Sequence, residues 1–457
     1  MEKEAEPVLD VGAGCLSGDM IGSDELAGMS EDDVLAAAGL RAERIRDDEA
    51  DLLRLAYQMA VINGPERLAL ASSDKPGREK ARRYGGDGTP EVCEFAAAKL
   101  AARIGMSTWA AGQLMADAVD LHHRSPEIWA RVGRGEVKAS YARYVVKQTR
   151  DLDRKAAAHV DKAVAESADG RIPWSRFESV VAGAIAKADP QATRERELKA
   201  QEATFAKKLR SEAHGMASFL TRAPVWLIDQ IAATVSSYST ALRDDLPELT
   251  DDQRDVMALL MLLTPGAAED TGALAERAPV VNLYVHTYAG RDHEGITRVE
   301  GHGPVTDAWV REVLGPSCRF KVYPVIDLAG QAPVDAYEIP GRHRQAVHLM
   351  TPADVFPFSS SLSRTQQVDH TIPYEQGGAS GVGNYGPMTV PHHRIKTHGG
   401  WDVQQPFPGI YVWRDPSGLF YLVDHTGTRK LPAGADVFPL VMEIYRDLPA
   451  VGLDWAS

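Results

Sequence analysis

The chain has 457 residues, which is enough for two or three domains that each bury a core. Its longest apolar run, Val256 to Leu263, is far shorter than the roughly 18 residues of a membrane span, and no secretory signal follows the acidic start. Three scattered cysteines argue against a disulfide framework and against a cysteine-based zinc site. We therefore expect a cytoplasmic protein without a membrane partner.

The net charge of −14 is unevenly distributed along the chain. Residues 1–51 hold 15 Asp and Glu but only 4 Lys and Arg, so the other residues together carry a charge of only −3. Binding of DNA needs Lys and Arg against the phosphates, and this distribution neither excludes nor supports it. We expect residues 1–46 to form an acidic, partly disordered segment.

Residues 47–265 have the pattern of a helical domain of unknown function. Apolar residues recur at a spacing of three to four, as in Leu100, Ile104 and Leu114. The glycine cluster at 85–88 marks a break. The charged stretch 191–210 predicts a solvated helix that links two bundles.

One part of this region has the spacing of a helix-turn-helix. Gly105 would form the turn and Ser107 would cap the second helix. Thr108, Trp109 and Gln113 could then reach a DNA groove. Ala-rich helix pairs with a glycine between them are also frequent in ordinary bundles, and we favour plain packing.

Residues 266–350 predict a small α/β connecting region. A strand is expected at 280–285 and can pair with 297–300. A short helix is expected at 305–314, with Thr306 or Asp307 near its N-cap. Further strands are expected at 321–323 and 325–326, and a helix at 342–350.

Residues 351–401 carry the chemistry, in the spacing D-H-x13-N-x8-H that is formed by Asp369, His370, Asn384 and His393. Hydrolysis of a phosphodiester needs a base that deprotonates water and a cation that stabilises the charge on the phosphate. Both must be held in place by the protein. A carboxylate with an imidazole makes a partial ligand set for Mg²⁺ or Mn²⁺. Gly377-Gly378 permits a tight turn between two strands, and a closing helix would carry His393.

The string Val-Asp-His-Thr-Ile-Pro-Tyr at 368–374, with Gly377-Gly378, Asn384, His392-His393 and Gly399-Gly400-Trp401, resembles the HNH endonucleases of the ββα-metal superfamily. The whole chain resembles bacterial HNH proteins that have a long N-terminal helical domain of unknown function. The resemblance implies an α+β protein: a mostly helical N-terminal region, a small α/β middle and a C-terminal ββα-metal module. Residues 402–457 would add a hairpin, 410–413 with 419–423, and a tail.

The resemblance also implies roles for single residues. His370 would be the general base, Asp369 and His393 would bind the divalent metal, and Asn384 would order the loop. Thr397 and His398 fall where some relatives place a further ligand. As donors close to the metal site on the same helix, Arg394 and Lys396 are expected to contact phosphate.

The sequence departs from the family at the positions of a structural zinc. Ser359, Gln366 and Thr389 stand where many relatives have cysteine, and His392 has no thiolate partners, so we expect no zinc there and a packing role for His392. The module would then depend on apolar packing, which we expect from Phe356, Phe358, Ile372, Tyr374 and Ile395.

The expected function is metal-dependent hydrolysis of DNA, in the manner of nucleases that often accompany mobile elements. Two alternatives stay open: an inactive DNA- or protein-binding protein with a vestigial nuclease fold, and a toxin-like nuclease that acts on RNA. Cleavage of both strands by one active site would favour a homodimer. The nuclease interpretation requires that Asp369 and His393 face each other and that solvent reaches His370.

Overall fold

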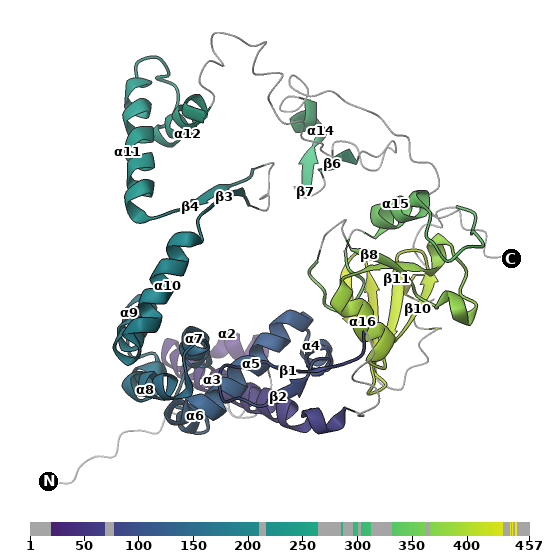
Figure 1. Cartoon of the computed structure of the whole chain (residues 1–457), viewed down its shortest axis with the longest axis horizontal. Coiled ribbons are helices and arrows are strands. Elements are labelled where there is room, and N and C mark those ends of the chain that lie inside the picture. The colour runs from purple at the N-terminus through teal and green to yellow at the C-terminus, as the bar shows by residue number, and fades with distance from the viewer. Residues whose placement is uncertain are drawn as a thin grey trace. The chain divides into compact units, whose positions relative to one another are not determined.

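The computed structural model describes residues 20–68, 77–209, 216–263, 285–286, 296–299, 303–311, 331–351, 353–361, 366–432, 439, 441 and 444–445 (Figure 1). It is a mixed α+β structure with small sheets and a mainly helical N-terminal region. The chain splits into two compact units. The first is Met1–Ala192 with Val325–Ser457, and the second is Thr193–Pro324. Within the described residues, no helix is both long and apolar enough to cross a membrane.

Helices dominate the N-terminal part of the first unit and begin earlier than predicted. A capping box starts the 32-residue helix α3: the Ser30 side chain accepts from the Asp33 amide, and Asp33 reaches back to the amide of Ser30. Residues 23–46 are therefore mostly helical, and residues 1–19 lie outside the described part. The helices are α2 (Ser23–Gly28), α3 (Glu31–Ile62), α4 (Ala96–Ile104), α5 (Thr108–Arg124), α6 (Pro126–Val132), α7 (Ala139–Thr149), α8 (Arg154–Val164) and α9 (Trp174–Ala188), with the short η1 (Pro65–Arg67) and η2 (Ala165–Asp169) and the hairpin β1 (Ala81–Arg83) with β2 (Glu91–Cys93).

The predicted turn between α4 and α5 is confirmed. Gly105 adopts a left-handed conformation with φ 76°, and the Ser107 hydroxyl accepts from the amide of Ala110 at the start of α5. α5 is the central helix of the bundle and buries most of its surface, including Leu114 and Leu121. Most of α5 is covered by its neighbours, as plain helix packing predicts, whereas Trp109 at its start is 75% exposed, and the DNA-reading interpretation stays a prediction.

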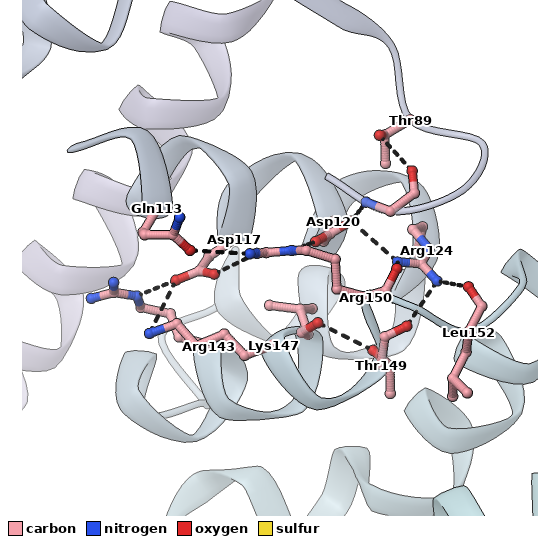
Figure 2. A network of polar contacts seen from close by, with 12 residues as sticks. Thr89, Gln113, Asp117, Asp120, Arg124, Arg143, Lys147, Thr149, Arg150 and Leu152 are labelled. Atoms are coloured by element: carbon pink, nitrogen blue, oxygen red, sulfur yellow. Dashed lines mark hydrogen bonds and ion pairs between the residues drawn. The ribbon is translucent and has the colours of Figure 1, made fainter. Parts of the chain in front are cut away.

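Buried charges hold the core of this bundle together. Asp117 and Asp120 on α5 are 0% and 1% exposed, and Arg150 bridges them at 2.7 Å from each carboxylate. Arg124, also buried, donates to Asp120 and to the carbonyl oxygens of residues 149, 150 and 152. Figure 2 shows this network, which Arg143 and Lys147 complete beside Asp117. Every buried charge in it has a partner, as burial requires.

The C-terminal part of the first unit contains two sheets. The strands β8 (Gln367–His370) and β9 (Tyr385–Met388) pair antiparallel, and helix α16 (Val390–His398) follows them. The predicted hairpin is confirmed, but it forms the middle of a four-stranded meander: β10 (Asp402–Phe407), β11 (Ile410–Arg414), β12 (Phe420–Asp424) and β13 (Gly427–Lys430). The predicted helix before the motif is α15 (Gly341–Met350).

The meander and the helical bundle share one hydrophobic core. Phe95, Ala98 and Ala102, on and just before α4, pack with Phe356 and Trp413 from the C-terminal part. This apolar contact joins residues that the sequence placed in separate domains, 47–265 and 351–457. It also explains why the first compact unit contains both the N-terminal helices and the C-terminal meander.

The second unit was expected to continue the helical domain up to residue 265. The charged helix α10 (Pro190–Glu202), which begins in the first unit, stops eight residues earlier than predicted, and β3 (Phe205–Lys208) pairs with β4 (Phe219–Arg222) beyond it. The helices α11 (Val225–Ala241) and α12 (Asp251–Leu263) follow.

The expected pairing in the middle region is confirmed, because β5 (Val285–His286) pairs with β6 (Ile296–Val299). Val305 lies in β7 (Gly303–Thr306) and not in a helix, although Thr306 does cap the short α14 (Asp307–Trp309). The strands expected at 321–323 and 325–326, and the part of the first strand before residue 285, lie outside the described residues.

Candidate functional site

The predicted site residues come from β8, from the short helix before β9 and from α16, and the structure brings two of them, Asp369 and His393, into contact. Asp369 and His370 end β8, Asn384 ends the short η7 (Val382–Asn384) just before β9, and His393 lies in α16. In the register of the two strands, Asp369 is opposite Gly386 and His370 is opposite Tyr385. Successive side chains of a strand point to opposite faces, so Asp369 and His370 have different surroundings.

Asp369 meets His393 and Lys396 at one carboxylate oxygen. Its Oδ2 lies 3.3 Å from His393 Nε2 and 2.6 Å from Lys396 Nζ. The side chains of Asp369 and His393 are 22% and 37% exposed, whereas that of Lys396 is only 9% exposed. The carboxylate and the imidazole therefore face each other, which is the first of the two conditions of the nuclease interpretation.

His370 is held through its Nε2 atom and is largely buried. Nε2 lies 2.9 Å from Ser380 Oγ, whose hydroxyl donates to the carbonyl oxygen of Ala336. Because the serine hydrogen is used there, the imidazole donates from Nε2, and its lone pair is on Nδ1. The residue is 5% exposed, and its ring lies against the buried ring of Tyr385 with centroids 5.0 Å apart, so the second condition, that solvent reaches His370, is not met in this structure.

Asn384 pins the loop between the two strands. Its Oδ1 accepts from the amide of Ile372 at 2.8 Å and from the hydroxyl of Thr371, and its Nδ2 donates to the carbonyl oxygens of Ile372 and Ala379, both at 3.0 Å. The side chain thus uses both ends of its amide, which is the loop-ordering arrangement expected from the sequence.

The two glycines of the motif make this loop possible. Gly377 has φ 84°, and a Cβ on Gly378 would lie 2.0 Å from the carbonyl oxygen of Ile372 and 2.7 Å from Nδ2 of Asn384. A side chain at Gly378 would therefore push the loop away from Asn384.

We expect Asn384→Ala to lower the free energy of unfolding by about 2–3 kcal/mol, because it removes the four hydrogen bonds by which this partly buried side chain holds the loop. Urea unfolding with a probe in the C-terminal part measures the change. Asn384→Asp keeps the acceptor and loses the donors, so it should retain part of this stability. A loss below about 0.5 kcal/mol in the alanine variant would contradict the loop-ordering role.

The structure does not place Arg394, Thr397 or His398 at the Asp369 cluster. Arg394 forms an ion pair with Glu94 at 2.5 Å and donates to the carbonyl oxygen of Gly77, so its guanidinium already has partners in the N-terminal part, and the phosphate contact stays a prediction. Thr397 donates to the carbonyl oxygen of His393 one turn earlier in α16. Within the described ranges, His398 does not complete a group of three metal-binding side chains with the others.

His392 has the packing role that its missing thiolate partners predicted. Its ring stacks on Phe356 with centroids 4.4 Å apart, Nδ1 lies 2.7 Å from Asp354 Oδ2, and Nε2 lies 3.1 Å from the hydroxyl of Thr108 in the helical bundle. Asp354 also accepts from the amide of Thr389 and so caps α16.

The packing expected of the aromatic and aliphatic residues is only partly correct. Phe356 and Ile395 are 1% and 3% exposed, and Phe358 packs against the same core. Ile372 and Tyr374 are instead 46% and 36% exposed, because the loop that carries them turns outward beside His370.

Sequence reasoning missed Ser380 and Asp354 and gave Lys396 a different partner. Ser380 lies inside the spacer between His370 and Asn384, and Asp354 lies fifteen residues before Asp369, so neither belongs to a short motif. The position of Lys396 did carry a signal: it follows His393 by three residues, and such residues share one face of a helix. Its charge could have been paired with Asp369 on that ground.

The separation of Asp369 Oδ2 and His393 Nε2 can be compared with that of two ligands of a divalent ion, although the same oxygen is also paired with Lys396. Two neighbouring ligands of an octahedral ion with bonds of about 2.1–2.2 Å lie roughly 3 Å apart, close to the separation of 3.3 Å found here. Water and a phosphate oxygen would supply the other ligands. No third His, Cys, Asp or Glu completes the group within the described residues.

Comparison of the chain with protein-family models, with curated proteins and with solved structures gave no match. The functional argument therefore depends on the residues of the site and on their geometry.

Proposed function

We propose that the chain is a metal-dependent endonuclease of the HNH type, and that β8, β9 and α16 are its ββα-metal module. The observation that carries this proposal is the meeting of Asp369 and His393 at 3.3 Å, across 24 positions of sequence. DNA is the proposed substrate because the motif resembles that of HNH endonucleases; RNA is the alternative substrate.

The residues divide the chemistry among them. His370 is oriented by Ser380 and is only 5% exposed, so the proposal requires a movement that admits water to its Nδ1. Nδ1 then takes the proton of the water molecule as the water oxygen attacks phosphorus and the bond to the leaving oxygen breaks. Asn384 holds the loop beside it. Asp369 and His393 would bind Mg²⁺ or Mn²⁺, which when bound stabilises the charge on the phosphate and leaving oxygens.

Incubation of the purified full chain with supercoiled plasmid tests this function. We expect conversion to the nicked form with Mn²⁺ or Mg²⁺ and none after EDTA, and the same preparation of His370→Ala should nick far more slowly. A parallel incubation with single-stranded RNA distinguishes the toxin-like alternative. Absence of nicking with every metal, or equal nicking by the variant, would favour a vestigial nuclease fold that only binds its partner.

The rate of nicking should depend on pH through His370. Burial lowers the pKa of this imidazole below its ordinary value of 6.5, the charge of Lys396 lowers it further, and Asp369 opposes them. Because the base acts when neutral, the rate at saturating metal should rise with pH below 6.5 and become constant at neutral pH. Single-turnover rates across this range measure it; a midpoint well above pH 7 would contradict the assignment of the base.

A further inference from the structure

Lys396 lies where a divalent ion would bind. It follows His393 by one helical turn in α16, and its side chain is only 9% exposed. Its ammonium lies 2.6 Å from Asp369 Oδ2, the same oxygen that faces His393 Nε2 at 3.3 Å, and it also donates to the carbonyl oxygen of His370. A cation of the chain therefore already occupies the only carboxylate of the proposed site within the described residues.

The positive charge of Lys396 neutralises the negative charge of Asp369 in the absence of a metal. A divalent ion bound between Asp369 and His393 would lie within a few ångströms of the ammonium, so attraction by the carboxylate and repulsion by Lys396 act over similar distances. The ion must displace the ammonium or bind beside it, and either event weakens binding. The imidazole nitrogen of His393 then contributes a larger share of the affinity.

We propose that Lys396 is an internal competitor of the divalent metal, which lowers the affinity of the site and favours Mn²⁺ over Mg²⁺. This inference rests on the proposed function. The preference follows because imidazole nitrogen suits transition-metal ions, whereas Mg²⁺ depends on oxygen ligands, and here the one carboxylate is already neutralised. Lys396 thus determines which metal the site takes.

Two other roles for Lys396 predict different results. A lysine that only anchors β8 to α16 would loosen the site when removed, and metal binding would weaken. If Lys396 contacts phosphate, its removal would leave metal binding unchanged when no nucleic acid is present. Its removal would also reduce the salt dependence of DNA binding.

Titration of the full chain with Mn²⁺ alone, followed by the electron paramagnetic resonance of free Mn²⁺, distinguishes these roles. Lys396→Met should bind Mn²⁺ about tenfold or more tightly than the wild type. Mg²⁺, measured by competition, should gain more than Mn²⁺. Lys162→Met, at an exposed lysine of α8, should bind like the wild type, and Asp369→Ala defines the Mn²⁺ that binds elsewhere on this acidic chain. Unchanged or weaker binding by Lys396→Met would overturn the proposal.

A second pair of variants separates the effect of charge from that of folding. Lys396→Gln and Lys396→Arg both keep a donor that can serve the carbonyl oxygen of His370, but only the arginine keeps the charge. If Lys396→Met unfolds at a clearly lower temperature than the wild type, the glutamine and arginine variants are compared with each other instead. The glutamine chain should bind Mn²⁺ about tenfold more tightly than the arginine chain, and a difference below about threefold overturns the proposal.

The nicking assay keeps this inference separate from the proposed function. If the chain nicks plasmid but its Mn²⁺ affinity is the same with and without a positive charge at Lys396, only the inference is refuted. A chain whose affinity responds as expected but which never nicks would refute the proposed function alone. Absence of Mn²⁺ binding at Asp369 in every variant would refute both.

Discussion

Replacement of His370 by alanine is expected to slow plasmid nicking by about 10²–10⁴-fold, the usual contribution of a general base. Its imidazole is the one whose Nε2 is held by Ser380 and whose Nδ1 carries the lone pair. The proposed metal ligands Asp369 and His393 stay in place, so Mn²⁺ binding by the variant should be unchanged. Single-turnover nicking at saturating metal measures the loss.

The chain contains a matched control for this variant. Asp424-His425 is a second Asp-His pair, located where β12 turns into β13, and His425 is exposed. His425→Ala should therefore nick at the wild-type rate. If the two alanine variants nick equally, then either the activity belongs to another protein or His370 is not the base.

Replacement of Asp120 by alanine is expected to lower the free energy of unfolding by about 3–5 kcal/mol, because it breaks a buried ion pair and leaves the other charge behind. The carboxylate accepts from the Gly86 amide at 2.7 Å and from Arg150 Nε at 2.7 Å, and it pairs with the buried Arg124. The remaining carbonyl partners of Arg124 cannot neutralise its charge (Figure 2). Urea unfolding followed by circular dichroism measures the loss.

An exposed ion pair of the same bundle provides the comparison. Asp51 pairs with Arg54 at 2.8 Å on the surface of α3, where both side chains are more than half exposed. Asp51→Ala should cost less than about 1 kcal/mol, since solvent screens such pairs. Equal losses in Asp51→Ala and Asp120→Ala would show that the network does not stabilise the bundle.

Local features of the fold were predictable where local chemistry decides them. The turn at Gly105 and the cap at Ser107 follow from the conformational freedom of glycine and from the hydrogen bonding of serine at a helix start. The hairpin around residues 415–418 follows from turn-forming residues between two apolar runs. The helical region began too late in the prediction, because the acidic composition of residues 23–46 concealed the capping box at Ser30.

The candidate site was predictable only in part. The loop-ordering position of Asn384 and the facing pair Asp369 and His393 could be inferred, because one short segment contains them all. The partners of Arg394 could not, since Glu94 and Gly77 lie about 300 positions away. The sequence places Arg394 one position after a proposed metal ligand, and only the folded chain shows that a distant carboxylate, Glu94, pairs with it.

The sequence by itself determined the elements and the chemistry of one segment: a helical N-terminal region, two strands and a helix near residue 370, and a carboxylate, an amide and imidazoles at the right spacing. Only the tertiary structure decided which charges neutralise one another. It brought Lys396 onto Asp369, Arg394 onto Glu94, and the bundle and the meander around one core at Phe95. The physical reason is that conformational preferences act between near neighbours in the chain, whereas burial and ion pairing act between whatever residues the folded chain brings into contact.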